Sequence, residues 1–123
     1  MLADAKAYSG FAVRDLDEAR EFYAGTLGLR VSPEDHGQMW LHLADGRDTL
    51  VYLQPDALPA SYTILNFEVD DIAEAVDALV ARGVRFERYD AAQDERGIFR
   101  DEGPYIAWFK DPAGNVLSVL QER

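Results

Sequence analysis

This sequence contains an internal repeat. Residues 11–31 and 67–87 align with one gap placed before a glycine. Seven positions are identical in the two copies, from the pair Phe11/Phe67 to the pair Arg30/Arg85. Chance would give about one or two identities over such a window, so an internal duplication explains the match better. The chain is therefore expected to fold as two copies of one supersecondary unit.

Each copy predicts one amphipathic helix. Asp15 is an expected N-cap with Glu18 three residues later as its capping-box partner, and Asp71 and Glu74 repeat this arrangement. Apolar side chains then follow at helical spacing, and a glycine ends each helix. Such helices cover one face of a sheet.

Strand signals surround both helices, and turn-forming sequences (Asp-Gly and Asp-Pro-x-Gly-Asn) separate the last two strands of each copy. The expected strands are 6–13, 29–31, 39–43 and 49–53 in the first copy, and 62–69, 84–87, 105–110 and 116–120 in the second. This order predicts the α+β class, with two tandem βαβββ modules, 1–57 and 58–123, in a single domain of residues 1–123.

Strand alternation divides the side chains between two faces of each predicted sheet. Phe11 and Val13 are expected to face the first helix, and Leu65, Phe67 and Val69 the second. The opposite, helix-free face is expected to carry Tyr8, Gly10 and Ala12 in one copy, and Tyr62, Ile64, Asn66 and Glu68 in the other.

Composition argues against several classes of function. The 123 residues carry a net charge of −11 and no Lys/Arg run, so neither nucleic acid nor a membrane surface is an expected partner. No apolar run approaches the roughly 20 residues of a membrane helix, and the first ten residues lack the pattern of a secretory signal. Cysteine is absent, which excludes disulfides and Cys-ligated metals. A cytoplasmic location is expected.

Two motifs resemble a known superfamily. The segment from Phe11 to Leu29 fits φ-x-V-x-D-L-x-x-A-x-x-F-Y-x-x-x-L-G-L, and the segment from Trp108 to Leu117 reads W-F-K-D-P-A-G-N-V-L. Together they resemble the glyoxalase/bleomycin-resistance/extradiol-dioxygenase (vicinal oxygen chelate) superfamily over essentially the whole chain. The resemblance implies that the two modules curl into a mixed β-sheet cup with the helices outside and a ligand against the helix-free face.

The resemblance also implies four positions at which enzymes of this superfamily hold a divalent metal with His and Glu. In this sequence they fall on Tyr8 and Ile64, each seven residues before a capping aspartate, and on Val51 and Ser118, matched through VYLQ and SVLQ. None of these side chains is a good metal ligand. We therefore expect no metal and no cofactor, as in the metal-free, antibiotic-binding branch, whose members commonly form homodimers around a small organic ligand.

Other polar and aromatic side chains are candidates for contact with that ligand. Glu68 could pair with a cationic ligand, act as an acid–base group, or form a salt bridge to an arginine at the rim. His42 is a candidate general base on a strand, whereas His36 is expected to be a solvated loop residue. Aromatic walls bind flat or cationic molecules well, although aromatic residues on strands are often core. The expected ligand-binding residues are Tyr8, Trp40, His42, Val51, Tyr62, Ile64, Asn66, Glu68, Tyr105, Trp108, Phe109 and Ser118.

Residues 89–104 form a long polar segment, which is either a lid over a ligand or a disordered acidic surface loop. The favoured function is sequestration of an organic, possibly cationic or aromatic, ligand of the antibiotic-resistance kind. One alternative is an enzyme, either metal-dependent and glyoxalase- or dioxygenase-like with atypical ligands, or metal-free with Glu68, His42 or Tyr8 as catalytic group. The other is a regulatory module whose helix-free face binds a protein.

Overall fold

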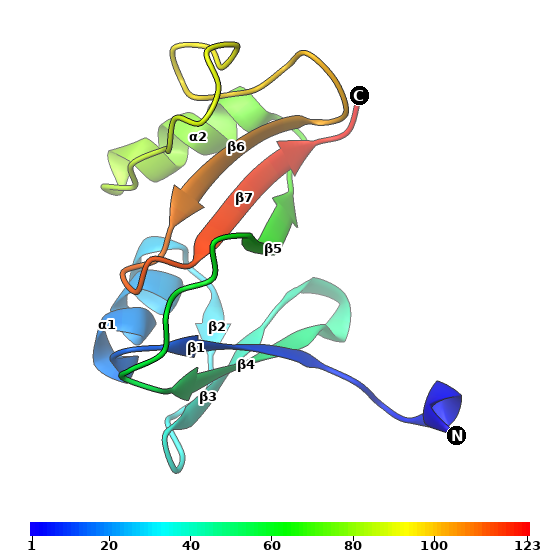
Figure 1. Ribbon diagram of the computed structural model, residues 1–123, viewed down its shortest axis with the longest axis vertical. Helices are drawn as coiled ribbons and strands as arrows, with labels where there is room; N and C mark the ends of the chain where they lie inside the picture. The colour runs from blue at the N-terminus through cyan, green and yellow to red at the C-terminus, as the bar shows by residue number, and fades with distance from the viewer. The chain divides into compact units, whose positions relative to one another are not determined.

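The computed structural model describes residues 1–123, and the chain divides into two compact units, Met1–Ala57 and Leu58–Arg123 (Figure 1). Each unit contains one mixed β-sheet and a helix that follows its first strand. None of the helices has the length and apolar character needed to cross a membrane. Two mixed sheets with few helices confirm the α+β class. The curled cup and the single domain of residues 1–123 stay predictions.

The first unit contains a four-stranded sheet in the order β1-β4-β3-β2 (Figure 1). β1 runs parallel to β4, and the other neighbouring strands are antiparallel. β1 begins three residues later than predicted. The elements are η1 Leu2–Asp4, β1 Ser9–Val13, α1 Leu16–Arg20, η2 Glu21–Thr26, β2 Arg30–Val31, β3 Gln38–His42, η3 Ala44–Gly46 and β4 Asp48–Leu53.

The first helix begins as predicted and then changes its winding. The Asp15 side chain caps α1 by accepting a hydrogen bond from the Glu18 N–H at 3.0 Å. After α1 the helix continues as the π-helix η2, so a single α-helix up to the glycine is a wrong prediction. Within η2, Tyr23 is fully buried against the ring of Phe11.

The second unit contains a three-stranded sheet in the order β5-β7-β6, so the last strand of the chain lies in the middle (Figure 1). β5 is parallel to β7, and β6 is antiparallel to it. Asp71 caps the helix of this unit by accepting from the Glu74 N–H at 3.1 Å. The elements are β5 Thr63–Glu68, α2 Ile72–Ala81, β6 Tyr105–Lys110 and β7 Val116–Gln121.

The predicted strand 84–87 is reduced to a single bridge, which corrects the sequence expectation. Phe86 bridges to Phe109 of β6, and the Glu87 N–H donates to the Trp108 carbonyl at 2.8 Å. The chain then leaves the sheet, and the Arg88 guanidinium donates to the backbone carbonyls of Asp94 and Glu95. The second sheet therefore lacks the fourth strand that the first sheet has in β2.

The core of each unit lies between its sheet and its helix. In the first sheet Phe11, Val51 and Met39 lie opposite one another across β1, β4 and β3, and all three are buried. In the second sheet Phe67, Val119 and Ala107 form the corresponding row. Phe11 and Phe67 therefore lie in the rows on the core side of their sheets, as expected, and the Phe11 ring contacts Tyr23 of η2. The expectation that Val51 lies on the helix-free face is wrong, because Val51 shares the face of Phe11.

A buried polar turn joins β6 to β7. The Asn115 Nδ2 donates to the Asp111 carboxylate at 3.0 Å, and the Asn115 Oδ1 accepts from the Ala60 N–H at 2.9 Å. Asn115 and Asp111 are both buried. The turn predicted from Asp-Pro-x-Gly-Asn therefore also fixes the segment that leads into β5.

Candidate functional site

The helix-free face of the first sheet presents an aromatic pair. Trp40 lies opposite Leu50 of β4, and Leu50 lies opposite Gly10 of β1. The Tyr8 ring, just before β1, meets Trp40 edge-on with 4.7 Å between ring centroids. Tyr8 remains 58% exposed. This face can therefore offer aromatic surface to a flat or cationic group.

The same face carries a histidine–carboxylate pair. His42 and Asp48 lie opposite each other on β3 and β4, with 3.0 Å between Nδ1 of the ring and the carboxylate oxygen. Such a contact orients the imidazole and leaves Nε2 directed elsewhere. His36 instead lies on the exposed β2–β3 connection, beside Asp35.

The helix-free face of the second sheet has a polar centre beside an aromatic pair. Asn66, Ser118 and Trp108 form one row across β5, β7 and β6. The Ser118 hydroxyl donates to the Asn66 side-chain oxygen at 2.6 Å, which leaves the Asn66 NH₂ group as a donor on an exposed residue. Glu68 lies on the same face, one alternation further along β5.

Tyr89 completes this second aromatic pair and was not among the predicted site residues. Its ring meets Trp108 edge-on at 5.7 Å between centroids, yet Tyr89 is 55% exposed. Burial raises the pKa of the Tyr89 phenol, and the Glu87 carboxylate raises this pKa further. Alternation continued past Phe86 would have placed Tyr89 on this face.

The observed pairing of the strands moves one of the four metal positions that the resemblance implies. Phe11 pairs with Val51, and its repeat partner Phe67 pairs with Val119. The residue of the first unit that corresponds to Ser118 is therefore Leu50, one position before Val51. The match through the letters VYLQ and SVLQ is displaced by one residue, which exchanges the two faces of a strand.

Four further residues that the sequence predicts as ligand contacts do not lie in regular strand positions on a helix-free face. Phe109 is buried on the helix side, with its ring 5.5 Å from that of Phe86, so its assignment to the helix-free face is wrong. Tyr105 alternates with Phe109 onto the helix side and carries the guanidinium groups of Arg100 and Arg123 on its ring. Tyr62 is exposed before β5, and Ile64 is half-buried at an irregularity between Thr63 and Leu65. Contact of Tyr62 and Ile64 with a ligand stays a prediction. The same holds for Tyr8, Trp40, His42, Asn66, Glu68, Trp108 and Ser118.

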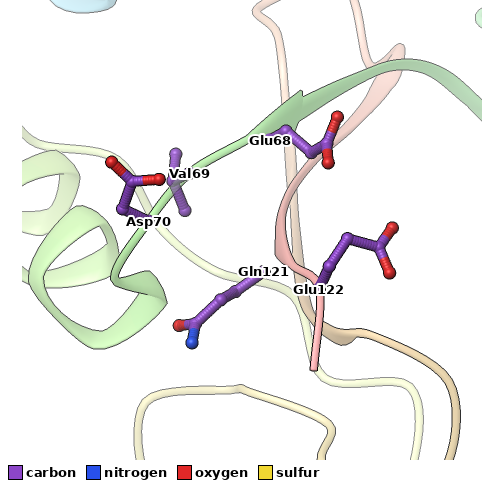
Figure 2. Close-up of a pocket in the computed structure, with 5 residues that line it drawn as sticks. All are labelled: Glu68, Val69, Asp70, Gln121 and Glu122. Atoms are coloured by element: carbon purple, nitrogen blue, oxygen red, sulfur yellow. The ribbon is translucent and has the colours of Figure 1, made fainter.

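A shallow acidic cavity of about 210 Å³ lies where β5 and β7 end (Figure 2). The lining residues are Glu68, Val69, Asp70, Gln121 and Glu122. Figure 2 shows the carboxylates of Glu68 and Glu122 pointing to the same side, with Asp70 nearer to the start of α2. The Gln121 amide oxygen accepts a hydrogen bond from the first N–H of α2, that of Ile72, at 2.9 Å. The cavity is suited to attract a positively charged group.

The side chains at the superfamily's metal positions do not suit a divalent ion. With Leu50 in place of Val51, the four are Tyr8, Leu50, Ile64 and Ser118. Leu50 and Ile64 have no donor atom, and the Ser118 hydroxyl is already bonded to Asn66. No group of three or more His, Asp or Glu side chains in the structure could hold a metal ion.

The segment 89–104 is folded along much of its length. The Gln93 side chain bonds to backbone groups on both sides of it, and the Asp94 carboxylate accepts from the N–H groups of Arg96 and Ile98. Ile98 is fully buried, and Phe99 bridges to Ile106 of β6. The alternative of a disordered surface loop is therefore wrong, whereas movement as a lid stays a prediction.

Solved structures of similar fold include three informative ones. A bleomycin-binding protein, solved in complex with bleomycin, is 26% identical, with a TM-score of 0.68 over 96% of this chain and 98% of that one. TnmS3, an antibiotic-binding protein from Streptomyces sp. CB03234, is 22% identical, with a TM-score of 0.69 over 98% of both chains. A glyoxalase family protein from Bacillus anthracis is 20% identical, with a TM-score of 0.70 over 96% of both chains.

Curated protein sequences gave no match to the chain. The family model described as Glyoxalase/Bleomycin resistance protein/Dioxygenase superfamily matches residues 7–119. This match covers both units, both helix caps and the buried turn between β6 and β7. The protein is thus a member of the glyoxalase/bleomycin resistance protein/dioxygenase superfamily.

Proposed function

We propose that this protein binds a small organic molecule on the helix-free faces of its sheets and releases it chemically unchanged. The observation that carries the proposal is the pair of aromatic contacts, Tyr8–Trp40 and Tyr89–Trp108, one on each helix-free face. Tyr8 and Tyr89 are more than half exposed, so both pairs are open to a ligand. The superfamily's metal positions carry no suitable donor set here, which favours binding over metal-dependent turnover.

Charge favours a ligand that is cationic as well as flat. The net charge of the chain is −11, and the cavity at the end of β5 and β7 is lined by three carboxylates. Such a field raises the local concentration of cations. Aromatic rings hold the same kind of group through cation–π contacts. The similarity to a bleomycin-binding protein and to an antibiotic-binding protein supports sequestration of an antibiotic-like molecule.

Tryptophan fluorescence tests the proposal directly, because both tryptophans of the chain lie on helix-free faces. Bleomycin titrated into the protein should quench this emission, and mass spectrometry should recover it intact. Trp40→Phe and Trp108→Phe should each remove part of the signal and weaken binding. Val80→Ala, on the exposed side of α2, is the matched control and should bind as the parent does. Unaltered emission with bleomycin and with a panel of flat cations would refute the proposal, and so would conversion of the ligand.

The His42–Asp48 contact favours one second candidate, a metal-free acid–base enzyme. An imidazole oriented by a carboxylate is a common arrangement for a general base, and this one lies on the face of Trp40. In that case a bound ligand would be converted, and His42→Gln would abolish conversion while leaving fluorescence quenching in place. Recovery of intact ligand from the parent protein would exclude this candidate.

A further inference from the structure

Gln93 organises the chain that follows the bridge at Phe86. Only 8% of the residue is exposed, and both ends of its amide are used. Its Oε1 accepts from the N–H groups of Tyr89 and Asp90 at 2.6 and 2.9 Å. Its Nε2 donates to the carbonyl oxygens of Glu87 and Gly97 at 3.0 and 2.6 Å. These backbone partners fix the orientation of the amide, since the reversed amide would set oxygen against oxygen.

A second anchor holds the far end of the same segment. The Asp94 carboxylate accepts from the N–H groups of Arg96 and Ile98, each at 2.9 Å. The Arg96 guanidinium makes two hydrogen bonds to Asp77 of α2, at 2.9 and 3.1 Å. This anchor ties the segment to the helix and does not involve Tyr89. The two anchors can therefore be removed separately.

Tyr89 is the residue that the first anchor places over the sheet. Its backbone is fixed by Gln93 while its ring meets Trp108 edge-on and remains largely exposed. An aromatic side chain that is already ordered loses less freedom when a ligand binds. The edge-on contact also leaves part of the Tyr89 ring free for a further stacking partner.

We propose that Gln93 is a positioning residue that holds Tyr89 over Trp108, and that these two rings form a preformed contact surface for a flat aromatic group. The second half of this inference rests on the proposed function. The first half concerns the free protein and can be tested without any ligand.

The first test uses Trp40→Phe protein, in which Trp108 is the only tryptophan, and acrylamide as a collisional quencher. Gln93→Leu removes all four hydrogen bonds at similar volume, and we expect the Trp108 quenching constant to rise about twofold as the segment opens. Tyr89→Ala should give the same rise. Arg96→Ala, which cuts only the anchor to α2, should leave the quenching constant unchanged.

Gln93→Glu keeps the acceptor for the Tyr89 N–H and loses both donors, so it provides a second test if the leucine variant does not fold. Its second oxygen would lie against the Glu87 and Gly97 carbonyl oxygens, so quenching should again increase. A folded Gln93 variant with the parent quenching constant would overturn the positioning role. An equal rise in Arg96→Ala would also overturn it, because any loosening of the segment would then suffice.

The second test uses 9-aminoacridine, a flat aromatic cation, followed by the anisotropy of its own fluorescence. Tyr89→Ala and Gln93→Leu should each raise its dissociation constant about tenfold, and Tyr89→Phe should change it little. If the parent and Tyr89→Ala bind the dye with equal affinity, Tyr89 and Trp108 do not form the contact surface. That result would leave the positioning role of Gln93 intact. Absence of dye binding to the parent would also overturn the contact surface, and the acrylamide result would still decide the role of Gln93.

Discussion

Leu50 and Val51 are neighbours in β4 that face opposite sides of the first sheet, and their variants should separate stability from binding. Val51 is fully buried, so Val51→Ala should lower the free energy of unfolding by about 2 kcal/mol. Leu50 lies opposite Trp40, so Leu50→Ala should weaken ligand binding and cost little stability. Urea denaturation and fluorescence titration measure the two effects. The reverse outcome would place Val51 on the binding face.

This pair also shows the limit of sequence matching for single residues. Identical letters in VYLQ and SVLQ suggest one register, whereas the hydrogen-bonded pairs Phe11–Val51 and Phe67–Val119 establish another. A displacement of one residue exchanges the two faces of a strand. Asn66 and Trp108 both lie in the row of the helix-free face. Alternation before the N-cap Asp71 predicts this for Asn66, whereas the facing of Trp108 depends on a hairpin register that the sequence leaves open.

Asn115 bonds at both ends of its amide inside the turn between β6 and β7. Asn115→Ala would leave the buried Asp111 carboxylate without one donor and the Ala60 N–H without its acceptor. We expect a loss of about 3 kcal/mol in the free energy of unfolding, measured by urea denaturation. Gln38→Ala, on an exposed residue of β3, should change stability by less than about 0.5 kcal/mol. Equal losses in the two variants would contradict this account.

At the scale of elements, the segment 88–98 should contribute stability that depends on pH. Burial acts to raise the pKa of Asp94, but hydrogen bonds from the Ile98 N–H, the Arg100 guanidinium and the Arg96 N–H outweigh it and lower the pKa below its ordinary 3.8. The folded state therefore favours the ionised carboxylate. This contribution is fully present above the ordinary pKa and is lost as the pH falls through the lowered one.

The measurement compares the parent with Asp94→Asn by thermal and urea unfolding across acid pH. The difference in unfolding free energy should be largest above about pH 5 and should shrink as the pH falls below about 3. Asp56→Asn in the first unit is the control for the loss of one negative charge outside this segment. A difference for Asp94→Asn that does not vary with pH would show that the ionised carboxylate is not what stabilises the segment.

Elements with local signals could be predicted, and elements that depend on distant or irregular contacts could not. The caps at Asp15 and Asp71 and the alternation of β5 are readable from spacing alone. The π-helix η2 and the loss of the strand at 84–87 are not, because the spacing of apolar residues there fits an ordinary α-helix and an ordinary strand. The order of the segment 89–104 depends on the Gln93 and Asp94 side chains, whose bonds to nearby backbone groups leave no pattern in the sequence.

For the whole molecule, we expect no stoichiometric metal. Protein purified without tags and dialysed against nickel, zinc, iron or manganese should retain none after buffer exchange, because the positions at Tyr8, Leu50, Ile64 and Ser118 supply no suitable donor set. Elemental analysis measures the retained ion. One tight ion per chain, coordinated by His42 or Glu68, would contradict the prediction and remove the main support for sequestration.

We also expect the protein to form a homodimer. A chain of 123 residues rarely covers all of its apolar surface alone, and several large side chains stay exposed here. They are Met1, Leu2, Tyr8, Leu53, Leu58, Tyr62, Val80 and Tyr89. Sedimentation equilibrium at micromolar concentration should give twice the mass of one chain. The mass of a single chain would show that these side chains remain in water.

The parallel pairing of the first and last strands of each unit sets an order for folding during synthesis. Ser9 of β1 contacts Thr49 of β4, which is 40 residues later in the chain. Asn66 of β5 contacts Ser118 of the central strand β7, which is 52 residues later. Contacts between such distant segments form slowly, since a long loop must close before they stabilise anything. The first unit can close while the second is still being translated. β5 and β6 must stay unpaired until β7 has been made, so the nascent second unit is the stage at which this protein is most exposed to aggregation and to chaperones.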